Sequence, residues 1–242
     1  MNAPFQYGTL ATKENFVDRV EDRAQLKNFL SSHINVMLIS PRRWGKSSLV
    51  KVAMEELQNE DKDIRVCFID AFNNAHSPFY RFGQMLFLDK IAKTEWMPFI
   101  RESFEKTGKH ISEAFASKVC DTVECHSWYL QQLCYFIWNA TADEVTEQTF
   151  QYGLRQLVNT NSPMFLSDTE TLAPSQIEML RAIKDGVQQL SSTEAKRSYA
   201  LGNPNTISKN KKVLKDKDII EERRGKLVFV DPVYRLWFSQ DY

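Results

Sequence analysis

The chain has 242 residues, which is enough for one large domain or two to three smaller ones. Its 43% hydrophobic and 26% charged residues are typical of a globular protein, and 31 acidic residues balance 31 basic ones, so net charge favours no class of partner. The N-terminus lacks the pattern of a signal peptide, and no apolar run approaches the roughly 20 residues of a membrane helix. We therefore expect a cytoplasmic protein with no membrane partner. The four cysteines have no CxxC spacing, which argues against a metal site or a disulfide scaffold.

The first part of the chain, residues 1–76, has the pattern of a strand, a helix and a second strand. Apolar runs at 35–39 and 64–70 flank a helical segment at 46–59. This order is typical of a βαβ unit, and it predicts a parallel sheet that is buried on both faces. We expect an α/β core here.

The middle part, residues 77–165, is almost free of strand signals. Its amphipathic segments at 95–105, 112–123 and 127–139 predict an all-helical region.

The last part, residues 172–242, begins with a helix at 175–184 and two shorter helical segments. Two short strands at 219–222 and 227–230 follow, with a turn at 223–226 between them. Three helices closed by a hairpin predict a winged helix.

The stretch ISPRRWGKSSL, residues 39–49, has the features of a phosphate-binding loop. Gly45, Lys46 and Ser47 occupy the last three places of the pattern G-x-x-x-x-G-K-[ST], while Ser40 stands where the first glycine would be. A strand before the loop and a helix after it give the context that the motif requires. An ordinary strand-to-helix turn is the alternative interpretation. The candidate binding residues are Ser40, Pro41, Arg42, Arg43, Trp44, Gly45, Lys46, Ser47 and Ser48.

Three stretches together resemble the archaeal-type ATPases, a family within the AAA+/STAND group of P-loop proteins. The PRR triplet precedes Gly45, the run Phe16–Arg19 with Glu21 and Leu26 is similar to the F-[IV]-x-R-E…L box, and residues 229–238 resemble a DP…W ending. The resemblance implies a P-loop core, an all-α lid and a C-terminal winged helix. It also implies ATP and Mg²⁺ as cofactors, with Lys46 on the phosphates, Ser47 on the metal and Val17 near the adenine.

The family's second acidic site is missing from its usual place. The only candidate strand end is Asp70, and Ala71 stands where a glutamate would orient the attacking water. We interpret the chain as a truncated core that has lost about two βα units, so we expect ATP binding with impaired hydrolysis and assign no catalytic residue. A two-stranded sheet with exposed edges also predicts self-association.

The segment 125–133 has two interpretations. It is similar to the family's turn and aromatic helix beside the nucleotide, although Cys125 and Ser127 replace the expected glycine and proline. His126 is then a candidate neighbour of the nucleotide, and Arg81 a candidate phosphate sensor. The alternative is that the aromatic residues form an ordinary core stripe at helical spacing, made of Trp128, Tyr129, Leu133, Phe136 and Ile137.

The winged helix suggests a second class of function. Its third helix, expected at 205–216, would turn Ile207 and Leu214 inward and basic residues outward, where they could contact DNA phosphates. Acidic residues at 216, 218, 221 and 222 weaken the positive electrostatic field of these basic residues. A protein-interaction module with a vestigial nucleotide domain is therefore an equal alternative. The candidate DNA-binding residues are Lys209, Lys212, Arg223 and Arg224.

Overall fold

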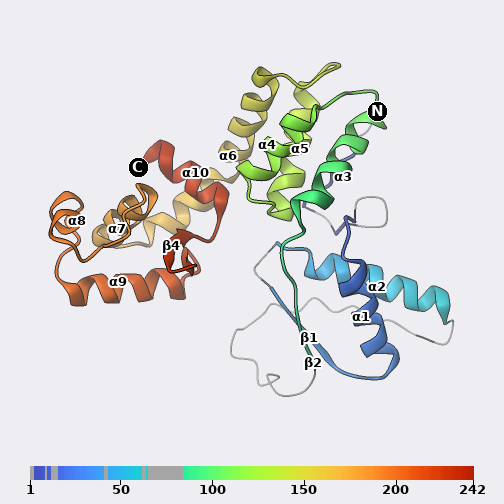
Figure 1. The fold of residues 1–242 in the computed structure, drawn as a ribbon, viewed down its shortest axis with the longest axis horizontal. Coiled ribbons are helices and arrows are strands. Elements are labelled where there is room, and N and C mark those ends of the chain that lie inside the picture. Colours follow the sequence, from blue (N-terminus) through green and yellow to red (C-terminus); the bar gives the residue numbers. More distant parts are fainter. Residues whose placement is uncertain (1–2, 9, 12–15, 41–42, 62–63, 65–83) are drawn as a thin grey trace. The chain divides into compact units, whose positions relative to one another are not determined.

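The computed structural model describes residues 3–8, 10–11, 16–40, 43–61, 64 and 84–242 (Figure 1). The chain forms two compact units, residues 1–153 and 154–242. The described residues are mostly helical, with two small two-stranded sheets. None of the described helices is both long and apolar enough to cross a membrane. The predicted division into three domains, 1–76, 77–165 and 172–242, remains a prediction.

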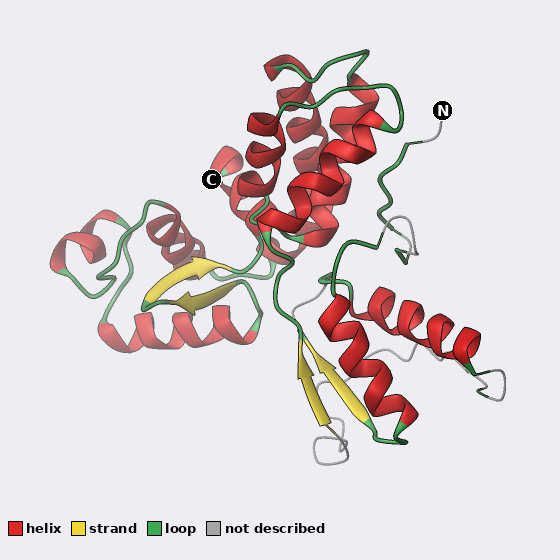
Figure 2. Cartoon of the chain, turned by 45° about the vertical axis from the view of Figure 1, so that its right-hand side comes forward, coloured by secondary structure: helices red, strands yellow, loops and turns green. Residues whose placement is uncertain are grey.

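Unit 1 contains a small parallel sheet packed against two helices. Strand β1 (Val36–Ile39) pairs with β2 (Gln84–Phe87) in a register that places Val36 opposite Gln84 and Ile39 opposite Phe87. Figure 2 shows the two strands side by side, next to α1 (Val20–Ser31) and α2 (Lys46–Glu60). The sheet and helices share one apolar core, which consists of Leu26, Leu49, Ala53, Leu86 and Leu88.

One prediction about this part of the chain is wrong. Strand β2 lies within residues 77–165, which were expected to be entirely helical; its run of four residues is too short for a pattern to stand out, and pairing with β1 stabilises it. Met85 and Phe87 are 50% and 63% exposed, so one face of the sheet is not buried, which agrees with the exposure expected of a sheet of only two strands. The strand predicted at 64–70 lies outside the described residues, except for Ile64.

The helices of the rest of unit 1 confirm the predicted positions to within two residues. They are α3 (Lys93–Glu105), α4 (Glu113–Thr122) and α5 (Ser127–Ala140), followed by α6 (Glu147–Glu170), which begins in unit 1 and was not predicted as one helix. Gly153 of α6 lies against α5, because a Cβ atom there would lie 2.6 Å from Cγ1 of Ile137. A glycine is therefore needed for the two helices to approach.

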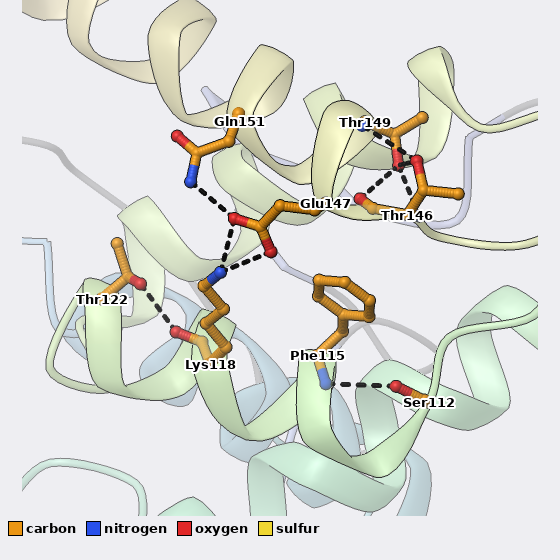
Figure 3. A network of polar contacts seen from close by, with 8 residues as sticks. All are labelled: Ser112, Phe115, Lys118, Thr122, Thr146, Glu147, Thr149 and Gln151. Atoms are coloured by element: carbon orange, nitrogen blue, oxygen red, sulfur yellow. Dashed lines mark hydrogen bonds and ion pairs between the residues drawn. The ribbon is translucent and has the colours of Figure 1, made fainter.

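Polar contacts join α4 to the start of α6 (Figure 3). The hydroxyl of Ser112 accepts a hydrogen bond from the backbone N–H of Phe115, which caps α4. Lys118 of α4 forms an ion pair of 2.7 Å with Glu147, and the amide of Gln151 donates to the same carboxylate. These contacts fix α6 to the helical part of unit 1.

Residues 3–8 and 10–11, which we call the N-terminal strap, pack on the helices and then reach the start of α2. Phe5 is buried against Phe99 and Phe104 of α3. Tyr7 contacts aromatic rings of α5, and the backbone N–H of Ala11 donates to Oγ of Ser48 at 3.0 Å. The strap thus connects the helical part of unit 1 to the phosphate loop.

Unit 2 begins in α6 and continues with three helices and a hairpin. The helices are α7 (Pro174–Lys184), α8 (Thr193–Ser198) and α9 (Pro204–Asp216), and the hairpin pairs β3 (Ile220–Arg223) with β4 (Lys226–Phe229) before the final helix α10 (Pro232–Asp241). Ile207 and Leu214 of α9 are buried, as predicted. This order of elements is the one expected for a winged helix, and that assignment remains a prediction.

The DP…W ending has a structural explanation in unit 2. The carboxylate of Asp231 accepts hydrogen bonds from the N–H groups of Val233 and Tyr234 at 2.8 and 2.9 Å, and Pro232 occupies the first position of α10. Trp237 is buried, and its indole N–H donates to Ser162 of α6 at 2.9 Å. The aspartate starts the last helix and the tryptophan anchors it.

Candidate nucleotide-binding site

The predicted phosphate loop connects β1 to the start of α2. Gly45 caps α2 with φ of 89°, a conformation that favours glycine, and no side chain occupies the cap. The first N–H groups of a helix have no hydrogen-bond partner within the helix, and they form the positive end of the helix dipole. The start of α2 is therefore suited to bind an anion.

Lys46 and Ser40 are brought together inside the loop. The ammonium group of Lys46 donates to the carbonyl oxygen of Ser40 at 2.7 Å and to its hydroxyl at 3.2 Å. The serine that replaces the first glycine therefore supplies a side-chain contact to the lysine. This contact holds the lysine side chain along the loop.

A cavity of about 230 Å³ lies beside the loop, entirely within unit 1. Its described walls include three cationic side chains, Arg19, Arg43 and Lys46, and no carboxylate. Such a charge distribution favours a polyanion. The full lining is Gln6, Tyr7, Leu10, Ala11, Phe16, Val17, Arg19, Arg43, Trp44, Gly45, Lys46, Ser47, Ser48, Ile91, Trp96, Ser127, Trp128 and Gln131.

Arg19 fixes three segments that surround the cavity. Its buried guanidinium forms an ion pair of 2.8 Å with Asp22. It also donates to the carbonyl oxygens of Trp44 and Asp89 at 2.9 and 3.0 Å. The arginine of the box at 16–19 thereby holds the phosphate loop next to the segment that follows β2, and this is the structural role of that sequence pattern.

Arg43 connects the phosphate loop to helix α5. Its guanidinium donates to the hydroxyl of Tyr129 at 3.1 Å and lies 5.1 Å from the centre of the Trp128 ring. The core-stripe interpretation of the segment 125–133 is confirmed in part, whereas its place beside a nucleotide remains a prediction. Tyr129, Leu133 and Ile137 are core residues, whereas Trp128 is half-buried and lines the cavity.

His126 is buried at the start of α5 but does not line the cavity. Desolvation, together with the positive charges of Lys90 and Arg43, lowers its pKa to about 4. The imidazole is therefore neutral at pH 7. Among the described residues its Nδ1 atom finds no hydrogen-bond partner.

Most of the remaining predicted nucleotide residues meet at the same cavity. Ser47 and Ser48 line it from the first turn of α2, and Val17 is buried in its wall. Ser47 is thus placed to offer a hydroxyl to Mg²⁺, whereas the carboxylate that usually helps to hold this metal is absent from the described lining. The predicted residues that lie outside the described part of the chain are Pro41, Arg42, Asp70, Ala71 and Arg81.

Comparison with solved structures is informative about the fold. No protein-family profile and no curated protein sequence matches the chain. A solved structure described as the Walker-type ATPase of Pyrococcus abyssi matches with a TM-score of 0.68 and 12% sequence identity, over 94% of this chain and 97% of that chain. The chain has the fold of a Walker-type ATPase. At this identity the likeness establishes the fold alone.

Outside this cavity, the candidate DNA-binding residues lie in unit 2. Lys209 and Lys212 are exposed on α9, and Arg224 lies in the hairpin turn with φ of 51°. Arg223 donates to the carboxylate of Glu221 at 2.8 Å, so part of its charge is balanced locally. DNA binding by these residues remains a prediction.

Several cavity residues were not predicted from the sequence. Tyr7 comes from the N-terminal strap, Trp96 from α3 and Gln131 from α5. The sequence offered only a weak signal for them, since each lies in a segment whose apolar pattern is explained by core packing. Their convergence with the Walker-type loop appears only in three dimensions.

Proposed function

We propose that this chain is an ATP-binding protein. The observation that carries the proposal is the convergence of the phosphate loop, the box at 16–19 and helix α5 on one cavity whose described charges are all positive. In this proposal the N–H groups at the start of α2 and the ammonium of Lys46 bind the phosphates, and Val17 packs near the base. Mg²⁺, when bound, would neutralise phosphate charge with the hydroxyl of Ser47 as one ligand.

We further propose that hydrolysis is impaired. Attack on the terminal phosphate requires a group that orients or deprotonates water, and a carboxylate usually does this. The described lining residues include Ser47, Lys46 and Arg43 but no aspartate or glutamate. The residues present support binding and charge neutralisation of the nucleotide more than cleavage.

Isothermal titration calorimetry with ATP and Mg²⁺ tests the binding proposal. Lys46→Ala should weaken ATP binding by at least tenfold, since it removes a charge-assisted contact to phosphate. Lys106→Ala is the matched control, because Lys106 is exposed and does not line the cavity. Equal affinity of the Lys46 variant and the unmodified chain would refute the proposal.

A phosphate-release assay tests the second proposal. We expect no turnover above that of the Lys46→Ala variant at saturating ATP. Rapid turnover that depends on Lys46 would show that a catalytic acid exists and would overturn the proposed impairment.

A further inference from the structure

Two residues that line the cavity each carry a buried polar atom for which the described residues offer no hydrogen-bond partner. Trp96 is 2% exposed and Gln131 is 6% exposed, and both residues line the cavity. Within the described part of the chain, nothing pairs with Nε1 of Trp96 or Oε1 of Gln131. A buried polar group without a partner costs about 1–3 kcal/mol, so folded proteins rarely keep one without a reason. Two such atoms in one cavity wall point to a ligand.

The two residues are held by different helices of unit 1. Trp96 lies in the first turn of α3, where its ring packs edge-on against Phe99. Gln131 lies in α5, one turn after Ser127 and Trp128, which line the same cavity. Because both residues belong to helices, their backbone positions beside the cavity are fixed, and only their side chains need to adjust to a ligand.

The chemistry of the two atoms restricts the ligand. An indole N–H can only donate, so it requires an acceptor such as a ring nitrogen. The carbonyl oxygen of Gln131 requires a donor such as an amino group. Tyr7 and Trp128 add aromatic surface to the same cavity, which suits a flat heterocycle. Adenine carries an amino group beside ring nitrogens, and so it offers both partners.

We propose that Trp96 and Gln131 select the base of the bound nucleotide. The Nε1–H group of Trp96 donates to a ring nitrogen of adenine, and Oε1 of Gln131 accepts from its amino group after rotation of the amide about its last side-chain bond. This inference rests on the proposed function, which places the phosphates of the same nucleotide at the loop. It adds two specificity-determining residues to a site otherwise defined by phosphate chemistry.

Calorimetry with two nucleotides tests the role of Gln131. ATP and purine riboside triphosphate differ only in the amino group, so we expect the full chain to bind ATP about tenfold more tightly, as one hydrogen bond to a buried group allows. Gln131→Leu should bring the ratio of the two affinities close to one. Asn139→Leu, an exposed position on the same helix, should leave the ratio unchanged.

Trp96→Phe tests the second contact. This variant keeps an aromatic ring and removes the N–H group. It should therefore weaken the binding of ATP and of purine riboside triphosphate by a similar factor, and the ratio of the two affinities should stay the same. Thermal unfolding of each variant identifies any loss of folding. The ratio of affinities is measured on folded protein, so it reports on base recognition even in a less stable variant.

Inorganic tripolyphosphate separates this inference from the proposed function. If tripolyphosphate binds in a Lys46-dependent manner but ATP and purine riboside triphosphate bind equally tightly, the base-selection role is refuted and the phosphate site stands. Tighter binding of GTP than of ATP would also refute the base-selection role, since the amide of Gln131 would then form hydrogen bonds with guanine and not with adenine. If none of these compounds binds, both proposals are refuted.

Discussion

The guanidinium of Arg43 in the phosphate loop donates a hydrogen bond to the hydroxyl of Tyr129 in α5, at 3.1 Å. The two residues are 86 positions apart in the chain, and their contact links the loop directly to the helical part of unit 1. Arg43 was predicted as a phosphate-binding residue, and the structure adds this second partner.

Tyr129→Phe should lower the free energy of unfolding of unit 1 by about 1 kcal/mol, because it removes one hydrogen bond and keeps the ring. Urea denaturation measures this change. A double-mutant cycle with Arg43→Ala isolates the pair, and we expect a coupling of about 0.5–3 kcal/mol. Strictly additive effects of the two substitutions would show that the contact has no energetic role.

Arg19→Met should destabilise the protein by about 1–3 kcal/mol, because it removes the hydrogen bonds of a buried guanidinium while its acidic partner Asp22 stays partly exposed to water. The substitution leaves the carbonyl oxygens of Trp44 and Asp89 without their donor. Arg23→Met is the matched control, since its ion pair of 3.3 Å with Glu56 is more exposed and should contribute less than about 1 kcal/mol. Similar losses in both variants, measured by urea denaturation, would contradict the role assigned to Arg19.

The pKa of His126 predicts a loss of stability in acid. Burial lowers this pKa from 6.5 to about 4, so the unfolded chain takes up a proton between these values while the folded chain does not. Stability should therefore fall as pH decreases from about 6.5 and level off below about 4. At about 1.4 kcal/mol per pKa unit, the contribution reaches about 3 kcal/mol.

His126→Gln should reduce this loss between pH 7 and pH 4.5, as measured by urea denaturation at both values. His33→Asn serves as the control because His33 is exposed and has a positive φ of 56°, which asparagine tolerates. If both variants lose as much stability as the unmodified chain, the neutral state of His126 is not the cause.

Cys125 should be the most reactive of the described cysteines. A hydrogen bond from the thiol of Cys120, aided by Lys90 and Lys93, lowers the pKa of Cys125 to about 7, whereas burial raises the pKa of Cys134. In a Cys67→Ser background, iodoacetamide at pH 7.5 should modify Cys125 first, as mass spectrometry of peptides would show. Equal rates at Cys125 and Cys134 would contradict this assignment. Cys120→Ala should slow the reaction near pH 7.

The helices were the most predictable part of the fold. The positions of α2, α3, α4, α5, α7 and α9 agree with the sequence patterns because each has an apolar stripe and several have clear start signals. In α9, for example, Asn203 caps the helix by accepting from Thr206 at 2.9 Å, and Pro204 follows it. Local chemistry was sufficient for these elements.

Strand β2 and the base-selecting residues could not be predicted in the same way. Four residues of β2 carry too little pattern, and their conformation depends on pairing with β1 across a long stretch of chain. Trp96 carries no sequence signal of its own among the apolar-face positions of α3, whereas Gln131 falls within the segment 125–133 but was not singled out there. The phosphate loop was found because its chemistry is contained in consecutive residues.

Three of the five tryptophans in the chain, Trp44, Trp96 and Trp128, line the cavity. The ring centre of Trp44 lies 5.7 Å from the ammonium nitrogen of Lys90, and the ring centre of Trp128 lies 5.1 Å from the central carbon of the Arg43 guanidinium. These two rings are therefore next to positive charges. Indole emission depends strongly on nearby charge and on contact with other rings. Three of the five tryptophans therefore report on this cavity, and its occupancy should be measurable as a change in the fluorescence of the unlabelled chain.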